Sequence, residues 1–225
     1  MKLTWLKWSA LPIAMLMVGT AAMAQEQSSS QGSSSPAPAA QTATPAAKPD
    51  PSVAQRKENQ QDRIANGVKS GQLTAGETAN LESKEAAING ETKADRAANG
   101  GKLTSAEKTQ INQQQNGLSK QIYQDKHNAN TAQYGNNKVG QRRENQQDRI
   151  AQGIKSGQLT AGETAKLENQ QKGINQQVKA DRSANGGKLS AGEKKQINGE
   201  QNAASKNIYK KKHNAKAQPG AKPKS

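Results

Sequence analysis

Cysteine and phenylalanine are absent from this 225-residue chain, and aromatic residues make up only 2% of it. The lack of cysteine excludes disulfides, a cysteine nucleophile and a lipoprotein anchor. Hydrophobic residues reach 31%, whereas globular chains commonly contain about 45–50%. Any hydrophobic core must therefore be thin. With a net charge of +15, the composition as a whole is typical of disordered proteins, so helices have to be argued from local patterns.

The first 24 residues have the features of a secretory signal peptide. A basic start with Lys2 and Lys7 precedes a short apolar run, and the segment ends in an Ala-Met-Ala cleavage pattern at 22–24. The apolar run is shorter than the roughly 20 residues that a membrane-spanning helix needs. We therefore predict a periplasmic or secreted protein with no transmembrane span after cleavage. An uncleaved membrane anchor is the alternative.

Ser, Ala, Pro and Gln dominate residues 25–52, which predicts a disordered linker. An internal duplication follows. The segment from Arg56 matches the segment from Arg142 at an offset of 86 residues, and about two-thirds of the aligned positions are identical. We predict helical module 1 over 53–130, a Gly/Asn-rich linker over 131–141, helical module 2 over 142–214 and a disordered basic tail over 215–225.

Each module is predicted to hold three helices, because helix-forming residues dominate and strand patterns are nearly absent. The predicted fold is therefore all-α. Gly-x-Leu-[Thr/Ser]-x-x-Glu occurs four times and supplies both helix joints of each module: the glycine ends one helix, and the hydroxyl residue and the glutamate form a capping box for the next. The predicted capping residues are Thr74, Glu77, Thr104, Glu107, Thr160, Glu163, Ser190 and Glu193. With about ten large apolar side chains per module, we expect either marginal stability or stabilisation by pairing of modules or chains.

The same joint weakly resembles a degenerate EF-hand loop. Aligned on Leu73, it has glycine at loop position 6 and Glu77 at position 12, but Val68 stands at position 3, where an oxygen ligand is required. The related loops that follow each module's second helix offer more oxygens. A weak Ca²⁺ site, if formed, would use Asp95, Asn99 and Glu107 or their equivalents Asp181, Asn185 and Glu193.

Basic residues concentrate at the C-terminus, where seven lysines follow Gln201 without an acidic residue. Such a segment attracts polyanions. Export and the scarcity of stacking aromatics favour anionic envelope polymers or lipid head groups over nucleic acid. The predicted polyanion-binding residues are Lys206, Lys210, Lys211, Lys212, Lys216, Lys222 and Lys224. A merely solubilising tail is the alternative.

Catalysis has little support, since the two histidines occupy equivalent places in the two modules and form no constellation with a nucleophile. Tandem modules of this pattern behind a signal peptide resemble small exported bacterial proteins of unknown function, and this resemblance implies no activity or cofactor. We predict a non-enzymatic interaction protein with affinity for anionic partners. The alternatives are a calcium-binding protein with EF-hand-like loops and a disordered chain that folds on binding.

Overall fold

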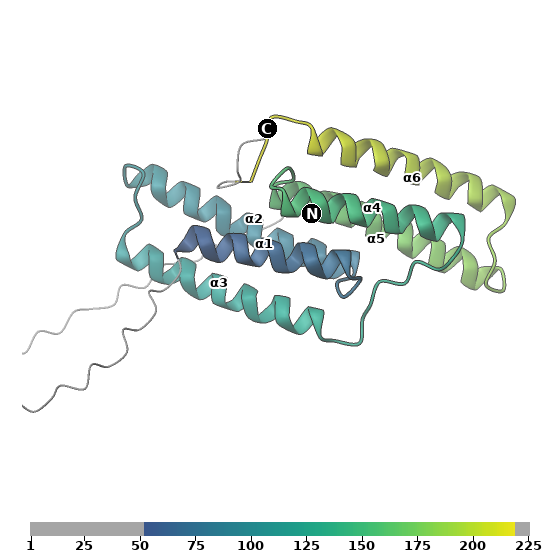
Figure 1. Ribbon diagram of the computed structural model, residues 1–225, viewed down its shortest axis with the longest axis horizontal. Helices are drawn as coiled ribbons and strands as arrows, with labels where there is room; N and C mark the ends of the chain where they lie inside the picture. The colour runs from purple at the N-terminus through teal and green to yellow at the C-terminus, as the bar shows by residue number, and fades with distance from the viewer. Residues whose placement is uncertain (1–51, 219–225) are drawn as a thin grey trace, which may run out of the picture. The chain divides into compact units, whose positions relative to one another are not determined.

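The computed structural model describes residues 52–218, and this part of the chain consists of six α-helices without a strand (Figure 1). The all-α prediction is confirmed. The helices are α1 (Val53–Lys69), α2 (Ala75–Ala98), α3 (Ser105–Lys126), α4 (Lys138–Lys155), α5 (Ala161–Ala184) and α6 (Ala191–Lys212). Across 52–218, no helix has the length and apolar content needed to cross a membrane. The predicted signal peptide, all but the last residue of the 25–52 linker, and Lys222 and Lys224 lie outside the described residues.

The joint between α1 and α2 shows why the Gly-x-Leu-Thr pattern recurs. Gly71 has φ +72°, a backbone conformation that glycine adopts without strain. This turn lets the amide of Leu73 donate to the carbonyl of Gly67 over 3.0 Å, and the Leu73 side chain is fully buried. Gly157 and Leu159 repeat the arrangement between α4 and α5. The joint therefore ends one helix and places a leucine in the core.

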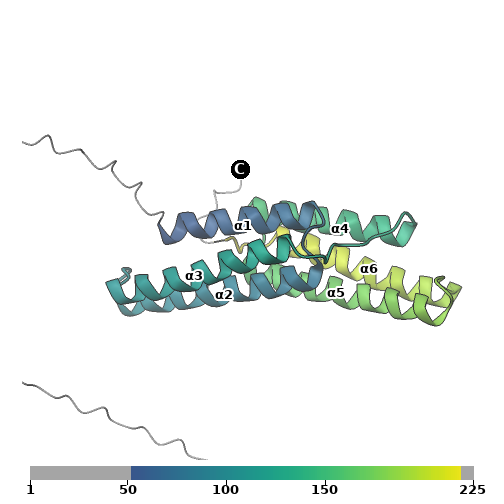
Figure 2. The same ribbon diagram turned by 90° about the horizontal axis from the view of Figure 1, so that it is seen from below.

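Helices α2 and α5 run antiparallel, and their contacts come in equivalent pairs. A Cβ placed on Gly76, in the first turn of α2, would lie 3.6 Å from Lys172 of α5. A Cβ on Gly162, in the first turn of α5, would lie 3.9 Å from Ala86 of α2. Because both pairs obey the 86-residue offset, a pseudo-two-fold axis relates the repeats. Figure 1 shows the loops after α2 and α5 at opposite ends of the helical body, and Figure 2 shows α1 continuing toward α4 on one side of it.

One hydrophobic core is shared by the two repeats. Ile64 and Leu81 of the first repeat belong to the same buried cluster as Ile150 and Leu167 of the second. A smaller cluster, centred on Ile197, lies within the second repeat. The sparse apolar residues of each repeat thus become sufficient only when the two are combined, since surface burial rises with domain size.

Buried glutamines supplement this core. The amide of Gln60 in α1 donates 2.7 Å to the carbonyl of Gln115 in α3, and Gln146 in α4 donates 2.7 Å to the carbonyl of Gln201 in α6. All four side chains are at most 2% exposed. Hydrogen bonds of this kind offset the cost of burying amides, which explains how a chain with so few hydrophobic residues forms a compact interior.

Two boundaries differ from the sequence prediction. Helix α4 begins at Lys138, so the last four residues of the predicted 131–141 linker form its first turn; Asn137 caps it and Val139 is buried. In the predicted tail, Gln218 is only 7% exposed. Its backbone amide donates to the carbonyl of Gly157 over 3.0 Å and its side chain donates to Gln61 over 2.8 Å. The chain after α6 is thus attached to both repeats at Gln218.

Candidate functional site: a cationic pocket

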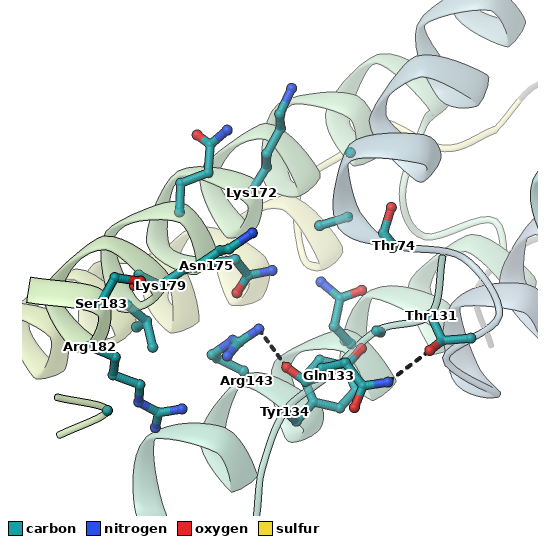
Figure 3. A pocket seen from close by; sticks show the side chains of 17 residues that line it. Thr74, Thr131, Gln133, Tyr134, Arg143, Lys172, Asn175, Lys179, Arg182 and Ser183 are labelled. Atoms are coloured by element: carbon teal, nitrogen blue, oxygen red, sulfur yellow. Dashed lines mark hydrogen bonds between the residues drawn. The ribbon is translucent and has the colours of Figure 1, made fainter. Parts of the chain in front are cut away.

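A pocket of about 710 Å³ lies where α4, α5, the linker after α3 and the first turn of α2 meet (Figure 3). Four of its lining residues are cationic, and none is Asp or Glu. A volume of this size is within the range that small-molecule sites occupy. The cations are Arg143, Lys172, Lys179 and Arg182. We call this cavity the cationic pocket.

Three of these cations come from one face of α5. Lys172, Lys179 and Arg182 are spaced seven and three residues apart, which places them close together on a helix of 3.6 residues per turn. Lys172 and Lys179 are exposed and Arg182 is half-buried. The fourth cation, Arg143, reaches the pocket from the neighbouring helix α4 (Figure 3).

Arg143 is the buried cation of the pocket, with 7% of its surface exposed. One guanidinium nitrogen donates 3.2 Å to the carbonyl of Gln133, and the guanidinium carbon lies 5.5 Å from the centre of the Tyr134 ring. Its Nε has no acceptor among the described residues. Burial lowers the pKa of Arg143, and the like charge of Arg182 lowers it further, although Tyr134 opposes the shift. A buried cation facing another cation is costly unless an anion approaches.

The linker after α3 is held tightly against the helices. The amide of Ala132 donates 2.8 Å to the carbonyl of Gly71. Farther along, a Cβ on Gly140 would lie only 2.1 Å from the carbonyl oxygen of Tyr134, so the first turn of α4 admits no side chain there. These contacts hold the linker against Gly71 and the first turn of α4, and the Tyr134 ring lies beside Arg143.

The first turn of α2 contributes backbone donors. Its capping box uses the amides of Thr74 and Glu77: the first donates 2.9 Å to the Glu77 carboxylate, and the second donates 3.3 Å to the Thr74 hydroxyl. The amides of Ala75 and Gly76 have no acceptor within residues 52–218, and both residues line the pocket. Free amides at a helix N-terminus, with the positive end of the helix dipole, favour anions.

A carboxyl group lies behind the pocket wall. Gln147 lines the pocket and donates 2.9 Å to Glu168, which is fully buried. Burial raises the pKa of Glu168 to about 8, although the hydrogen bond from Gln147 opposes the shift. Glu168 is therefore mainly protonated and uncharged at pH 7, and it leaves the positive potential of the pocket intact.

The predicted capping residues form four closed capping boxes. In each, the Thr or Ser side chain accepts from the backbone amide of the glutamate three residues later, and that glutamate accepts from the backbone amide of the Thr or Ser. Glu77 has a second task, since Asn128 and Asn130 beyond α3 donate to it over 2.8 and 3.2 Å. Burial would raise the pKa of Glu77, but hydrogen bonds from Thr74, Asn128 and Asn130 outweigh burial and lower it.

The candidate metal ligands are brought together in another role. Asn99 donates 2.7 Å to the side chain of Glu107 and 2.9 Å to the backbone carbonyl of Asp95. Asn185 makes the same two contacts with Glu193 and Asp181. In each loop, the side-chain N–H group of the asparagine therefore points at the glutamate carboxylate that would have to bind the cation. Over residues 52–218, no group of three or more His, Asp or Glu side chains gathers as a metal site would require.

The lysines of the predicted polyanion-binding segment lie away from the cationic pocket. Lys206 and Lys210 are exposed on α6, Lys211 and Lys212 on the same helix are half-buried, and Lys216 is exposed beyond it. None of them lines the pocket. Ile208, on the same stretch of α6, is fully buried, so this segment is part of the folded body as well as a source of charge.

The four cations of the pocket were missed by sequence reasoning. The spacing of Lys172, Lys179 and Arg182 on one predicted helix was a usable signal, but nothing in the sequence indicates that the linker and another helix N-terminus close over them. The chain matches no protein-family model, no curated protein and no solved structure.

Proposed function

We propose that this is a non-enzymatic, exported binding protein for an anionic polymer, and that the cationic pocket receives anionic groups of that polymer. The single observation that carries the proposal is that four cations and two free helix-N-terminal amides line the same cavity, without a carboxylate in the lining. A concave pocket suits one anionic group of a chain better than a flat lipid surface. The signal-peptide pattern of residues 1–24 supports an envelope or extracellular setting.

The pocket is proposed in place of the basic tail as the main determinant of binding. Surface lysines attract polyanions at long range but are screened by salt. Arg143 and the amides of Ala75 and Gly76 are buried or fixed by the backbone, so their contacts with an anion are screened less.

The test compares two variants that each lose three charges. One carries Lys172→Gln, Lys179→Gln and Arg182→Gln; the other carries Lys206→Gln, Lys210→Gln and Lys216→Gln. On a polyphosphate or heparin column, the first variant is expected to elute at clearly lower salt than the second. If the two variants elute at the same salt concentration, the weaker retention is due to the loss of net charge alone. Earlier elution of the second alone would place binding in the tail.

A vesicle experiment separates polymers from lipids. We expect the protein to be retained less by vesicles of anionic lipid than by polyphosphate at the same salt concentration. If vesicles bind better, and the pocket variant binds them as well as the unmodified protein does, the proposed pocket–polymer contact is rejected.

A further inference from the structure

A second cavity, of about 600 Å³, occupies the pseudo-two-fold-related place in the other half of the molecule. It lies where α1, α2, the first turn of α5 and the chain after α6 meet. We call it the twin pocket. Lys93 and Arg96 line it at the positions equivalent to Lys179 and Arg182, and Lys57 stands where the cationic pocket has Arg143. Like the first, this pocket has no Asp or Glu in its lining.

The twin pocket also repeats the helix N-terminus. The amides of Thr160 and Glu163 are used in the capping box of α5, with distances of 3.2 and 3.3 Å. The amides of Ala161 and Gly162 have no acceptor in the described part of the chain, and both residues line the cavity. In place of Ala132, Gln218 closes one side of the pocket through its bond to the carbonyl of Gly157.

Two differences weaken the twin pocket. Ala86 stands where the cationic pocket has Lys172. Glu85 stands where the second repeat has Gln171. Burial lowers the pKa of Lys57, and the nearby charge of Glu85 is the strongest of the influences that raise it. Burial raises the pKa of Glu85 to about 7, and Lys57 opposes this shift. The twin pocket thus lacks one cation and has a second cation that is partly neutralised.

We propose that the twin pocket is a second binding site for the same anionic groups, with lower affinity than the cationic pocket. This inference rests on the proposed function. It makes the protein a two-site binder, so a polymer whose anionic groups reach both pockets is retained more strongly than either site alone would allow.

NMR titration with tripolyphosphate tests both sites at once. The amide signals of Gly76 and Gly162 report on the cationic and the twin pocket separately. We expect both signals to shift and to saturate at different tripolyphosphate concentrations, Gly76 first. If neither shifts, the proposed function fails. If Gly76 shifts and Gly162 does not, the proposed function stands and the second site is rejected.

Paired variants supply the controls. Lys93→Gln with Arg96→Gln should abolish the shift of Gly162 and leave that of Gly76; a Gly162 shift that persists would show that a helix end alone binds the anion and would overturn the site. Glu85→Gln with Ala86→Lys gives the twin pocket the residues of the second repeat and should tighten it by about five- to tenfold. Gln171→Glu with Lys172→Ala should weaken the cationic pocket by a similar factor. If neither exchange changes the affinity, the proposal that residues 85 and 86 make the twin pocket weaker than the cationic pocket is refuted.

Discussion

Glu82 and Glu168 occupy equivalent positions in α2 and α5, and the two carboxyl groups are buried so close to the pseudo-two-fold axis that Glu168 raises the pKa of Glu82. Burial is the larger cause, and it raises the pKa of both groups to about 8. Gln61 and Gln147 each donate a hydrogen bond to one of them, over 3.1 and 2.9 Å. The centre of the molecule therefore holds two carboxyl groups that remain protonated at neutral pH.

This pair predicts that stability falls as the pH rises from about 4.5 to about 8. Glutamates in the unfolded chain have an ordinary pKa of 4.5, so the folded protein holds more protons between that value and about 8. The stabilisation is complete below pH 4.5 and is lost as pH rises to about 8. Glu85, whose pKa is also raised, adds to the loss of stability with rising pH. Lys57 lowers the pKa of Glu82 and so makes this loss smaller. Thermal melts from pH 5 to pH 9 should show a falling midpoint.

The double variant Glu82→Gln, Glu168→Gln is the test of the cause. The new amide side chains still accept the hydrogen bonds from Gln61 and Gln147, but they cannot ionise. The melting midpoint of the variant should therefore change much less over the same pH range. At pH 9 it should exceed that of the unmodified protein. Glu144→Gln, at an exposed site, is the control and should leave the pH dependence unchanged. An equally steep fall in the double variant would show that other groups cause it.

Two glycines facing the joints should not tolerate alanine. A Cβ on Gly67 would lie 2.7 Å from Leu73, and one on Gly153 would lie 2.6 Å from Leu159. Because both leucines are fully buried, each Gly→Ala change should cost about 1–3 kcal/mol of unfolding free energy. Urea denaturation measures this cost.

Two other helical glycines provide the matched control. Nothing lies within 4 Å of a Cβ on Gly117 or Gly173, and the other repeat has alanine at both positions, Ala203 and Ala87. Gly117→Ala and Gly173→Ala should each stabilise the protein by about 0.5–1 kcal/mol, because alanine favours the helix. A loss of stability in these variants would contradict the packing described for α3 and α5.

The joints should differ in their sensitivity to loss of the cap. Thr74→Ala is expected to cost about 1–2 kcal/mol and Thr104→Ala about 0.5 kcal/mol. Without the Thr74 hydroxyl, Glu77 is held less firmly, and its hydrogen bonds from Asn128 and Asn130 are weakened as well. Glu107, by contrast, accepts hydrogen bonds only from residues of its own loop. Chemical denaturation of both variants, with Thr74→Ser as the conservative control, gives the comparison. Equal costs would mean that Glu77 does not hold the end of α3.

Calcium should leave the fold unchanged. The carboxylates of Glu107 and Glu193 already accept from backbone amides and from Asn99 and Asn185, and a cation would have to displace these donors. Far-UV circular dichroism and a thermal melt in chelator and in millimolar Ca²⁺ should coincide. A raised midpoint that is abolished by Asp95→Asn and Asp181→Asn would instead support the EF-hand-like alternative.

The helices and their caps were predictable because they depend on neighbours within a few residues. The boxes formed by Thr74 with Glu77 and by Thr160 with Glu163 follow from hydroxyl and glutamate spacing alone. The start of α4 was predicted too late because Val139 is stabilised in the helix by packing on the second repeat's own core, a contact distant in sequence. Pairing of the repeats was one of the alternatives that the thin core left open, and nothing in the sequence indicated its antiparallel register.

The site was less predictable than the fold. Lys172, Lys179 and Arg182 share a helix face that the sequence displays, but Arg143 is more than 25 residues away from them and the amides of Ala75 and Gly76 lie in the other repeat. The α2–α5 packing brings the two amides to the cavity, and α4 brings Arg143. The lysine-rich C-terminus was conspicuous because its lysines lie close together in the sequence. Closeness in the sequence does not show whether charges line one cavity in the folded protein.

The matched positions of Gly76 beside Lys172 and of Gly162 beside Ala86 are what two identical chains adopt across an isologous interface. The chain thus has the geometry of a homodimer whose subunits have been fused. In a homodimer every substitution appears twice, so both sites must change together. Fusion removes that constraint: one copy carries lysine at the position where the other carries alanine, and the two halves are free to differ in charge.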